Sequence, residues 1–266
     1  LQLQKDDRIV FVGNTFAERM QLFGWFETFL HARFPDHDLT VRHMGWSADE
    51  IGARPRPLGF GSRQRYLAEE GADVVIACFG MNESYAGEQG LQRFRGALDA
   101  WIRELLSRPY NERSPPRLVL VSPIAHESLG GMLPDGDAHN GVLERYSRVM
   151  AEIARAHSVP FVDLFHPTLK HAGKPLTSNG IHLTRYGYWR VSQIMARALG
   201  LIDGVPPPNA ATPLASAEAL RRAVHDKNDT WQLLWHGPNM EYVHGRRNRL
   251  GGAKRMPAER VQLRDL

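Results

Sequence analysis

The residues of this sequence that could do chemistry together are an amide next to a hydroxyl, a second amide and an imidazole. They are Asn14, Thr15, Asn82 and His182. The first two come shortly after the apolar run 8–12, and the second amide comes shortly after the apolar run 73–79. Acyl-transfer enzymes use a hydroxyl as nucleophile, an imidazole as base and N–H groups as oxyanion donors. These residue types therefore indicate nucleophilic catalysis if the fold brings them together.

Apolar runs alternate with helical periodicity along most of the chain. The expected strands are 8–12, 39–41, 73–79, 118–121 and 161–163, and the expected helices are 16–34, 91–106, 140–157 and 188–199. Within the strand expected at 73–79, residues 74–79 are all apolar, which is typical of a strand that is covered on both faces. The alternation predicts an α/β protein with a parallel sheet, in which ligands bind at the carboxyl ends of the strands. The polar segments expected there are 13–15, 45–49, 80–84, 122–127 and 179–182.

The order of these polar segments resembles that of the SGNH hydrolases, also called GDSL-type esterases, over about residues 8–200. That family has its nucleophile in a Gly-Asp-Ser turn, then an oxyanion glycine, a Gly-x-Asn-Asp block and a late Asp-x-x-His block. The corresponding segments are Gly-Asn-Thr at 13–15, Ser-Ala-Asp at 47–49, Gly-Met-Asn-Glu at 80–83 and Asn-Gly-Ile-His at 179–182. The resemblance implies a three-layer α/β/α, flavodoxin-like sandwich with a central parallel sheet.

Two of these segments also occur in a narrower group. Gly-Asn-Thr and Asn-Gly-Ile-His resemble a subgroup of SGNH-like domains from planctomycete-type bacteria, in which heme-binding domains can follow. This resemblance implies a periplasmic or secreted protein and linked domains in a longer chain. The chain begins with Leu1 and not with methionine, which suggests a processed product or a piece of something longer.

The segments depart from the family at two catalytic positions. Thr15 stands where the family has its nucleophilic serine, and its methyl group restricts the rotamer and crowds the approach to a carbonyl. Asn179 stands where the family has the aspartate that orients the histidine. In a serine protease this replacement lowers turnover by about 10⁴, because the amide favours the wrong imidazole tautomer. A nearby carboxylate could substitute beside His182, and Glu83 and Glu127 are the candidates.

The residues expected to bind the oxyanion differ less from the family pattern than the two catalytic positions do. Asn82 matches the family's block-three asparagine, and Ala48 can donate its backbone N–H in place of the glycine. One such donor contributes about 3 kcal/mol to the transition state. An alternative for Asn82 is that it caps the following turn. The residues expected to line the substrate site are Asn14, Gly45, Glu83, His126 and Glu127.

A metal site is the weaker alternative for the polar segment 122–127. His126 and His139, with Glu127 or Asp137, offer imidazole and carboxylate ligands, which suit zinc and other divalent ions. Their spacing does not match the close helical histidine pairs of known zinc motifs. Neither a metal nor another cofactor is expected. The single cysteine, Cys78, excludes an internal disulfide, and its apolar surroundings indicate a buried small hydrophobe.

The sequence predicts a main domain at 1–204 and a C-terminal extension at 205–266. A run of three prolines at 206–208 marks the boundary. In the extension, 215–224 is expected to be helical and 231–235 has the composition of a strand. The extension has too few aliphatic residues for a core of its own, so we expect it to pack on the main domain. Its tail from residue 244 carries seven Lys or Arg and two Asp or Glu, although no nucleic-acid motif accompanies it and no nucleic-acid partner is expected.

Two functions follow from the sequence. The first is an ester hydrolase for small acyl groups, including O-acetyl groups on saccharides, with a Thr/His site. The second is a catalytically weakened or inactive domain that binds glycan as an accessory module. Aromatic and amide side chains of the extension suit sugar recognition as well as packing. No apolar run approaches the roughly 18 residues that a membrane span requires.

Overall fold

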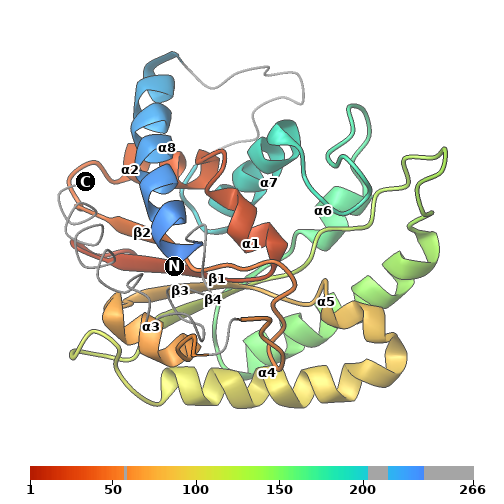
Figure 1. The fold of residues 1–266 in the computed structure, drawn as a ribbon, viewed down its shortest axis with the longest axis horizontal. Coiled ribbons are helices and arrows are strands. Elements are labelled where there is room, and N and C mark those ends of the chain that lie inside the picture. The colour runs from red at the N-terminus through yellow and green to blue at the C-terminus, as the bar shows by residue number, and fades with distance from the viewer. Residues whose placement is uncertain (57–58, 203–214, 237–266) are drawn as a thin grey trace.

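A parallel β-sheet forms the centre of the protein (Figure 1). The structure is a computed structural model that describes residues 1–56, 59–202 and 215–236. Within these residues the sheet has five strands in the order β2-β1-β3-β4-β5. The strands are β1 (Arg8–Gly13), β2 (Thr40–His43), β3 (Val74–Cys78), β4 (Arg117–Val121) and β5 (Phe161–Val162). This doubly wound order confirms the predicted α/β/α fold, and its switch point lies between β1 and β3.

Successive strand residues supply two separate cores because side chains alternate between the faces of a sheet. Ile9 and Phe11 of β1 belong to one core, and Val10 and Val12 to the other. Helices α2 (Trp25–Arg33) and α7 (Arg185–Ala198) cover the first face together with α1 (Thr15–Met20). Helices α3 (Arg63–Glu69), α4 (Leu91–Leu106) and α5 (Asp137–Ala156) cover the second. The remaining elements are η1 (Glu83–Ala86), η2 (Glu88–Gly90), α6 (Phe165–Leu169) and α8 (Ala215–Trp235).

The single helix expected at 16–34 is wrong, because these residues form two helices. Helix α1 ends at Met20 and α2 begins at Trp25. Gly24 between them has a φ of +63°, a backbone conformation that side-chain-bearing residues rarely adopt. The apolar periodicity continues across this turn because both helices face the same core.

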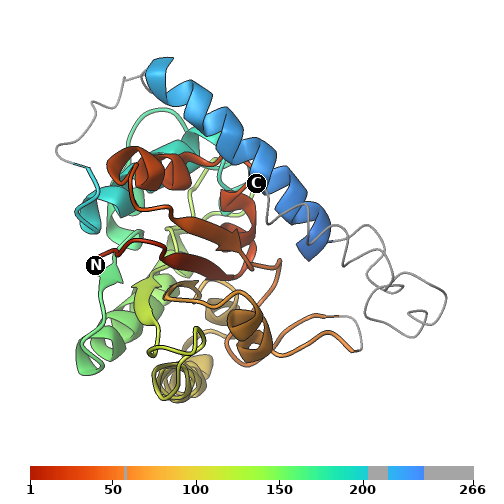
Figure 2. The same cartoon turned by 90° about the vertical axis from the view of Figure 1, so that its left-hand side faces the viewer.

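The strand expected at 231–235 is wrong, because these residues form the end of helix α8. Its buried positions are Val224, Asn228, Trp231 and Trp235, which are spaced as one face of a helix. Tryptophan is common in strands, which explains the prediction. The spacing of the two tryptophans from Val224 and Asn228 is that of a helix. Helix α8 runs along the edge of the sheet beside β2 and packs against α2 (Figure 2).

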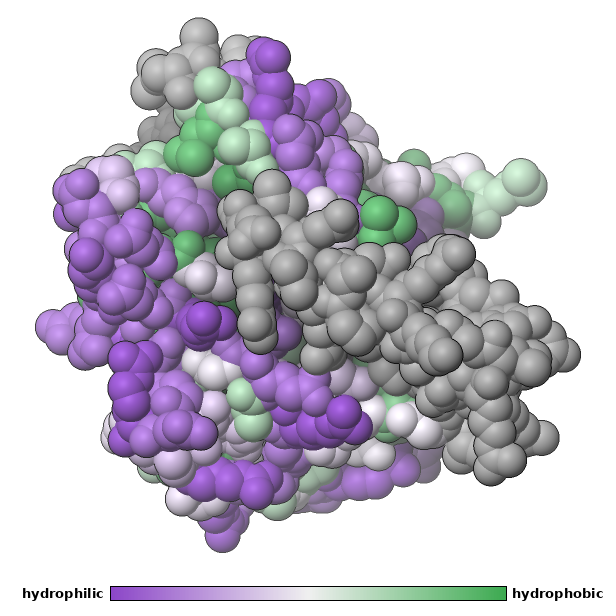
Figure 3. Space-filling model, turned by 60° about the vertical axis from the view of Figure 1, so that its left-hand side comes forward, coloured by the Kyte–Doolittle hydropathy of each residue, from purple (hydrophilic) through white to green (hydrophobic). Residues whose placement is uncertain are grey.

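The expected domain boundary near 204, the prolines at 206–208 and the basic tail from 244 lie outside the described residues. The side of the molecule that Figure 3 shows is mainly hydrophilic where no grey atoms cover it, with small separate apolar areas. No helix in the described ranges combines the length and the apolar character that crossing a membrane requires.

Candidate functional site

A small pocket lies at the switch point of the sheet, at the carboxyl ends of β1 and β3. Its volume is about 80 Å³. Three polar side chains of the predicted site, Thr15, Asn82 and His182, line it together with Asn14. The other lining residues are Phe16, Cys78, Phe79, Met81, Tyr85, Ser122, Pro123, Ile124 and Ile181. The fold therefore places residues that are up to 168 positions apart in the sequence around one cavity.

The turn after β1 places Thr15 at the start of helix α1. Gly13 has a φ of +137°, and a Cβ there would lie 2.0 Å from the Cys78 carbonyl oxygen, so only glycine fits. The Asn14 side-chain oxygen accepts the Phe16 N–H at 3.0 Å and caps the helix. Within the described residues, neither the hydroxyl nor the backbone N–H of Thr15 has a hydrogen-bond partner, which leaves both available to a ligand.

Asn82 lines the pocket, and its side chain does not cap the turn that follows it. It occupies the N-cap position of η1, but its side chain makes no capping hydrogen bond. Its amide has no other partner in the described part of the chain, and the residue is half-buried. The capping alternative is therefore wrong, and the amide is placed where it can donate to a ligand in the pocket.

The Asn179 amide determines which nitrogen of His182 carries the proton. The Asn179 oxygen accepts the backbone N–H groups of His182 at 3.0 Å and Ile181 at 3.4 Å. This fixes the amide, so that its nitrogen faces His182 Nδ1 at 2.9 Å. Because the amide nitrogen can only donate, Nδ1 must accept, and the proton of the neutral ring lies on Nε2. A base that takes a proton at Nε2 needs the opposite tautomer.

The surroundings of His182 favour its neutral form. Partial burial, and after it the Arg19 guanidinium, lower the pKa of His182 from its usual value. A proton added at Nδ1 would also point at the Asn179 amide nitrogen, which is itself a donor. Both effects act in the same direction, against the imidazolium.

Neither carboxylate considered as a partner for His182 is bonded to its ring. Glu127 accepts the N–H groups of Leu176 and Thr177 at 2.9 and 2.7 Å and so holds the start of the segment that leads to His182. Glu83 accepts the N–H groups of Ile51 and Gly80 at 3.0 and 2.8 Å. Burial raises the pKa of Glu83 to about 6. Both residues fix loops around the pocket, and neither lines it.

The loop after β2 lies against helix α1 and contains the residues predicted as an oxyanion donor. A Cβ on Gly45 would lie 2.3 Å from the Glu18 backbone nitrogen, so glycine permits this close packing. Ala48 has a φ of +63°, the left-handed region that favours glycine, in agreement with the glycine that the family has here. Neither Gly45 nor Ala48 lines the pocket, and the Ala48 N–H stays a predicted donor.

His126 and His139 form a hydrogen-bonded pair beside the pocket. Their Nδ1 atoms are 3.1 Å apart, and His139 Nε2 lies 2.8 Å from the Ser84 hydroxyl. Asn140 bonds both the backbone N–H and the carbonyl of His126. Among the described residues, no group of three or more histidine, cysteine, aspartate or glutamate side chains could hold a metal ion.

The apolar walls of the pocket were not predicted from the sequence. Phe16, Met81, Tyr85 and Ile181 each lie next to or near a motif residue. Their proximity in sequence was the available signal, but the direction of their side chains depends on the turns. Cys78 also contributes to the wall, and burial raises the pKa of its thiol, so it stays protonated. This confirms Cys78 as a buried, unreactive residue.

Comparison with known proteins gives the family of the chain and agrees with its fold. The model of the GDSL-like lipase/acylhydrolase family matches residues 15–190, more than half of the chain. The chain therefore belongs to the GDSL-like lipase/acylhydrolase family, a family of ester-cleaving enzymes. A comparison with curated proteins returned no match.

Solved structures with the same fold include several hydrolases of low sequence identity. A gut microbial diltiazem-metabolizing enzyme is 18% identical with a TM-score of 0.57; the alignment covers 75% of this chain and 48% of that enzyme. An α/β hydrolase from the metagenome of Lake Arreo, Spain, is 15% identical with a TM-score of 0.57 and coverages of 76% and 99%. An acetylxylan esterase from Geobacillus stearothermophilus is 15% identical with a TM-score of 0.56 and coverages of 78% and 100%. At these identities the likeness concerns the fold.

Proposed function

We propose that the protein hydrolyses esters of short acyl groups, with Thr15 as nucleophile and His182 as base. One observation supports this proposal: Thr15, Asn82 and His182 line one pocket, and within the described part of the chain no hydrogen bond occupies the Thr15 hydroxyl, the Asn82 amide or His182 Nε2. Groups that are held in place but left unbonded are available to a substrate. The location at the switch point is where open α/β sheets bind their ligands.

The proposed reaction proceeds through an acyl-threonine. The reaction uses the His182 tautomer whose proton lies on Nδ1, which the contact with the Asn179 amide disfavours. In that tautomer Nε2 takes the proton of Thr15 as its oxygen attacks the ester carbonyl, and the tetrahedral oxyanion accepts hydrogen bonds from Asn82 and the Thr15 N–H. The Ala48 N–H is proposed as a third donor. Collapse of the intermediate breaks the ester bond, and the alcohol leaves with the proton from His182. A water molecule, activated by the same ring, then releases the acid and restores Thr15.

The size of the pocket supports a short acyl group. Its volume is about 80 Å³, and a cavity of about 150 Å³ holds a molecule as large as benzene, so the pocket suits a group smaller than benzene. An acetyl group has a comparable volume, whereas a long fatty acyl chain does not fit. An acetylated saccharide as the natural substrate is part of the proposal, and the acetylxylan esterase among the structures of the same fold supports it.

A second candidate, a glycan-binding accessory domain with little turnover, is favoured by the contact between Asn179 and His182. The amide holds the imidazole in the tautomer that donates from Nε2. In this state the side chains around the pocket offer hydrogen bonds to a bound carbonyl or hydroxyl, but His182 does not accept the proton of Thr15.

Hydrolysis of p-nitrophenyl acetate and of acetylated xylo-oligosaccharides separates the two candidates. The hydrolase requires that the protein release acetate faster than Thr15→Val, which keeps the shape of threonine without its hydroxyl, and faster than His182→Ala. Equal rates for the three proteins would refute the hydrolase. Saccharide binding by all three in calorimetry, without turnover, would then support the accessory domain.

A further inference from the structure

Helix α8 contacts the loop after β2 although it lies outside the family segment. It spans Ala215–Trp235, whereas the family match ends at residue 190. Two of its indole groups, one turn apart, donate to carbonyl groups at and after the end of β2. Trp231 Nε1 donates to the His43 oxygen at 2.6 Å, and Trp235 Nε1 donates to the Gly45 oxygen at 3.1 Å. The first bond holds the strand, and the second holds the loop.

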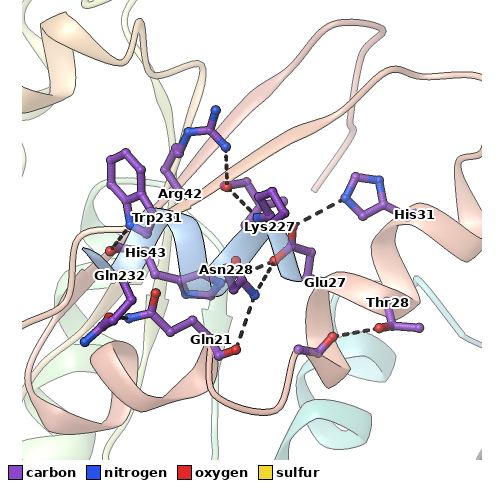
Figure 4. A network of polar contacts seen from close by, with 12 residues as sticks. Gln21, Glu27, Thr28, His31, Arg42, His43, Lys227, Asn228, Trp231 and Gln232 are labelled. Carbon is purple, nitrogen blue, oxygen red and sulfur yellow. Dashed lines mark hydrogen bonds and ion pairs between the residues drawn. The ribbon is translucent and has the colours of Figure 1, made fainter. Parts of the chain in front are cut away.

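A buried polar network fixes the position of α8 along the sheet edge (Figure 4). The carboxylate of Glu27 on α2 accepts hydrogen bonds from Lys227 and Asn228 on α8. Lys227 also donates to the Val41 carbonyl at 3.0 Å, and Asn228 to the Gln21 carbonyl at 3.3 Å. Such bonds are satisfied only when donor and acceptor meet in one geometry. The helix is therefore held in a single register, which determines where its last turn lies.

The loop is in contact with α8 on one side and with α1 on the other. The His236 ring stacks on Trp46 with centroids 3.8 Å apart. Ser47 donates to the Glu18 carboxylate at 2.5 Å, and His236 Nε2 lies 3.6 Å from the same carboxylate. Glu18 belongs to α1, the helix that begins with Thr15. The end of α8 thus connects the loop to the element that carries the proposed nucleophile.

We propose that Trp235 and His236 are positioning residues that hold loop 45–49 at a fixed distance from Thr15. This inference rests on the proposed function, which places an oxyanion donor in that loop. An oxyanion donor acts at 2.7 to 3.1 Å, and a displacement of about 1 Å can lower the rate by about 10². The Trp46 N–H donates to the Gly13 carbonyl at 2.9 Å, and the contacts from α8 add to this bond in holding the loop.

The matched variants Trp235→Phe and Trp231→Phe test this proposal in the full chain. Each removes one indole N–H from α8 and keeps an aromatic ring, but only the first loses a bond to the loop. For Trp235→Phe we expect kcat for p-nitrophenyl acetate to fall about five- to tenfold with KM within about twofold, because oxyanion donors act in the transition state. For Trp231→Phe we expect kcat within about twofold of the unchanged protein. The two variants should lose a similar amount of melting temperature.

Hydrogen–deuterium exchange gives a second measurement that does not depend on turnover. The peptide that covers 45–49 is expected to exchange several-fold faster in Trp235→Phe than in Trp231→Phe. Equal exchange and equal kcat in the two variants would overturn the positioning role. If the unchanged protein hydrolyses no ester, the proposed function fails, and faster exchange of 45–49 in Trp235→Phe still supports contact of α8 with the loop.

Discussion

Asn179 is the residue that most strongly limits the chemistry of this site. Its oxygen is occupied by two backbone N–H groups, and its nitrogen therefore faces His182 Nδ1. An aspartate in the same place would accept the backbone bonds with one oxygen and the Nδ1 proton with the other. It would also stabilise the imidazolium that forms when Thr15 loses its proton. The amide keeps the backbone bonds, but it neither accepts a proton from Nδ1 nor stabilises the imidazolium.

The substitution Asn179→Asp is expected to raise kcat by about 10³ to 10⁴, which corresponds to about 4 to 5.5 kcal/mol of transition-state stabilisation. The reason is that the carboxylate restores the tautomer in which Nε2 is free to accept a proton. The measurement is steady-state hydrolysis of p-nitrophenyl acetate. The same substitution in His182→Ala should give no increase, and an increase there would show that the new carboxylate acts without the histidine.

The pH dependence of kcat/KM should reflect the lowered pKa of His182. Partial burial and Arg19 lower this pKa below its usual value of about 6.5. Because the neutral ring is the active form, activity falls as the pH drops through the shifted pKa, and the acid limb should have its midpoint below about 6.5. Arg19→Gln should move the midpoint upward. A midpoint above 6.5 in the unchanged protein would contradict this assignment.

At the level of single residues, the sequence predicted which residues line the pocket better than it predicted which side chains bond to one another. Thr15, Asn82 and His182 were predicted from their places after strands and before a helix, and all three line the pocket. Glu83 and Glu127 were expected near His182 or the substrate, but they bond backbone N–H groups of the surrounding loops. The direction of a carboxylate depends on turns that a pattern of residue types does not specify.

At the element scale, strands were predicted more reliably than the helices around them. Strands β1, β3 and β4 are apolar runs that both cores cover, so their composition alone identifies them. Helix α8 was divided into a helix and a strand because it mixes tryptophan with polar residues. Two of its polar residues are not on the solvent face, since Lys227 and Asn228 bond Glu27 inside the interface with α2. Polar pairing of this kind breaks the hydrophobic pattern that identifies a buried helix.

The attachment of α8 depends on the carboxylate of Glu27. Burial raises the pKa of Glu27, but Lys227, His31 and His43 outweigh burial and hold it well below its usual range. Glu27→Gln is expected to lower the free energy of unfolding by about 3 kcal/mol or more, because Lys227 would stay buried without its counterion. Urea unfolding at neutral pH measures this loss.

The matched control is Glu144→Gln, which removes an exposed helical ion pair with Arg148. Such a pair contributes about 0.5 kcal/mol or less. Because the pKa of Glu27 is lowered by folding, its stabilising contribution is present above the unfolded value and is lost as the pH falls through the folded one. The difference in free energy of unfolding between Glu27→Gln and Glu144→Gln should therefore become smaller in strong acid. Equal losses for both variants at neutral pH would contradict the role of Glu27.

At the scale of the whole molecule, the sheet order explains how distant segments form one site. Strand β1 lies between β2 and β3, so the chain leaves β1 and β3 toward opposite faces of the sheet. The switch point lies between the ends of these two strands, where Asn14 follows β1 and Asn82 follows β3. The alternation of strands and helices predicted the parallel sheet, and the resemblance supplied the strand order. The sequence did not indicate that α8 extends past the family segment to the loop after β2.

Covalent modification of Thr15 by an acyl-transfer inhibitor would test most directly whether this residue is the nucleophile of an ester hydrolase. An alkyl fluorophosphonate reacts with a nucleophilic hydroxyl that a histidine activates, and peptide mass spectrometry locates the adduct. We expect the adduct on Thr15, with faster labelling in Asn179→Asp and none in Thr15→Val or His182→Ala. If Thr15 stays unmodified both in the unchanged protein and in Asn179→Asp, the account of this site as a threonine-dependent ester hydrolase is contradicted.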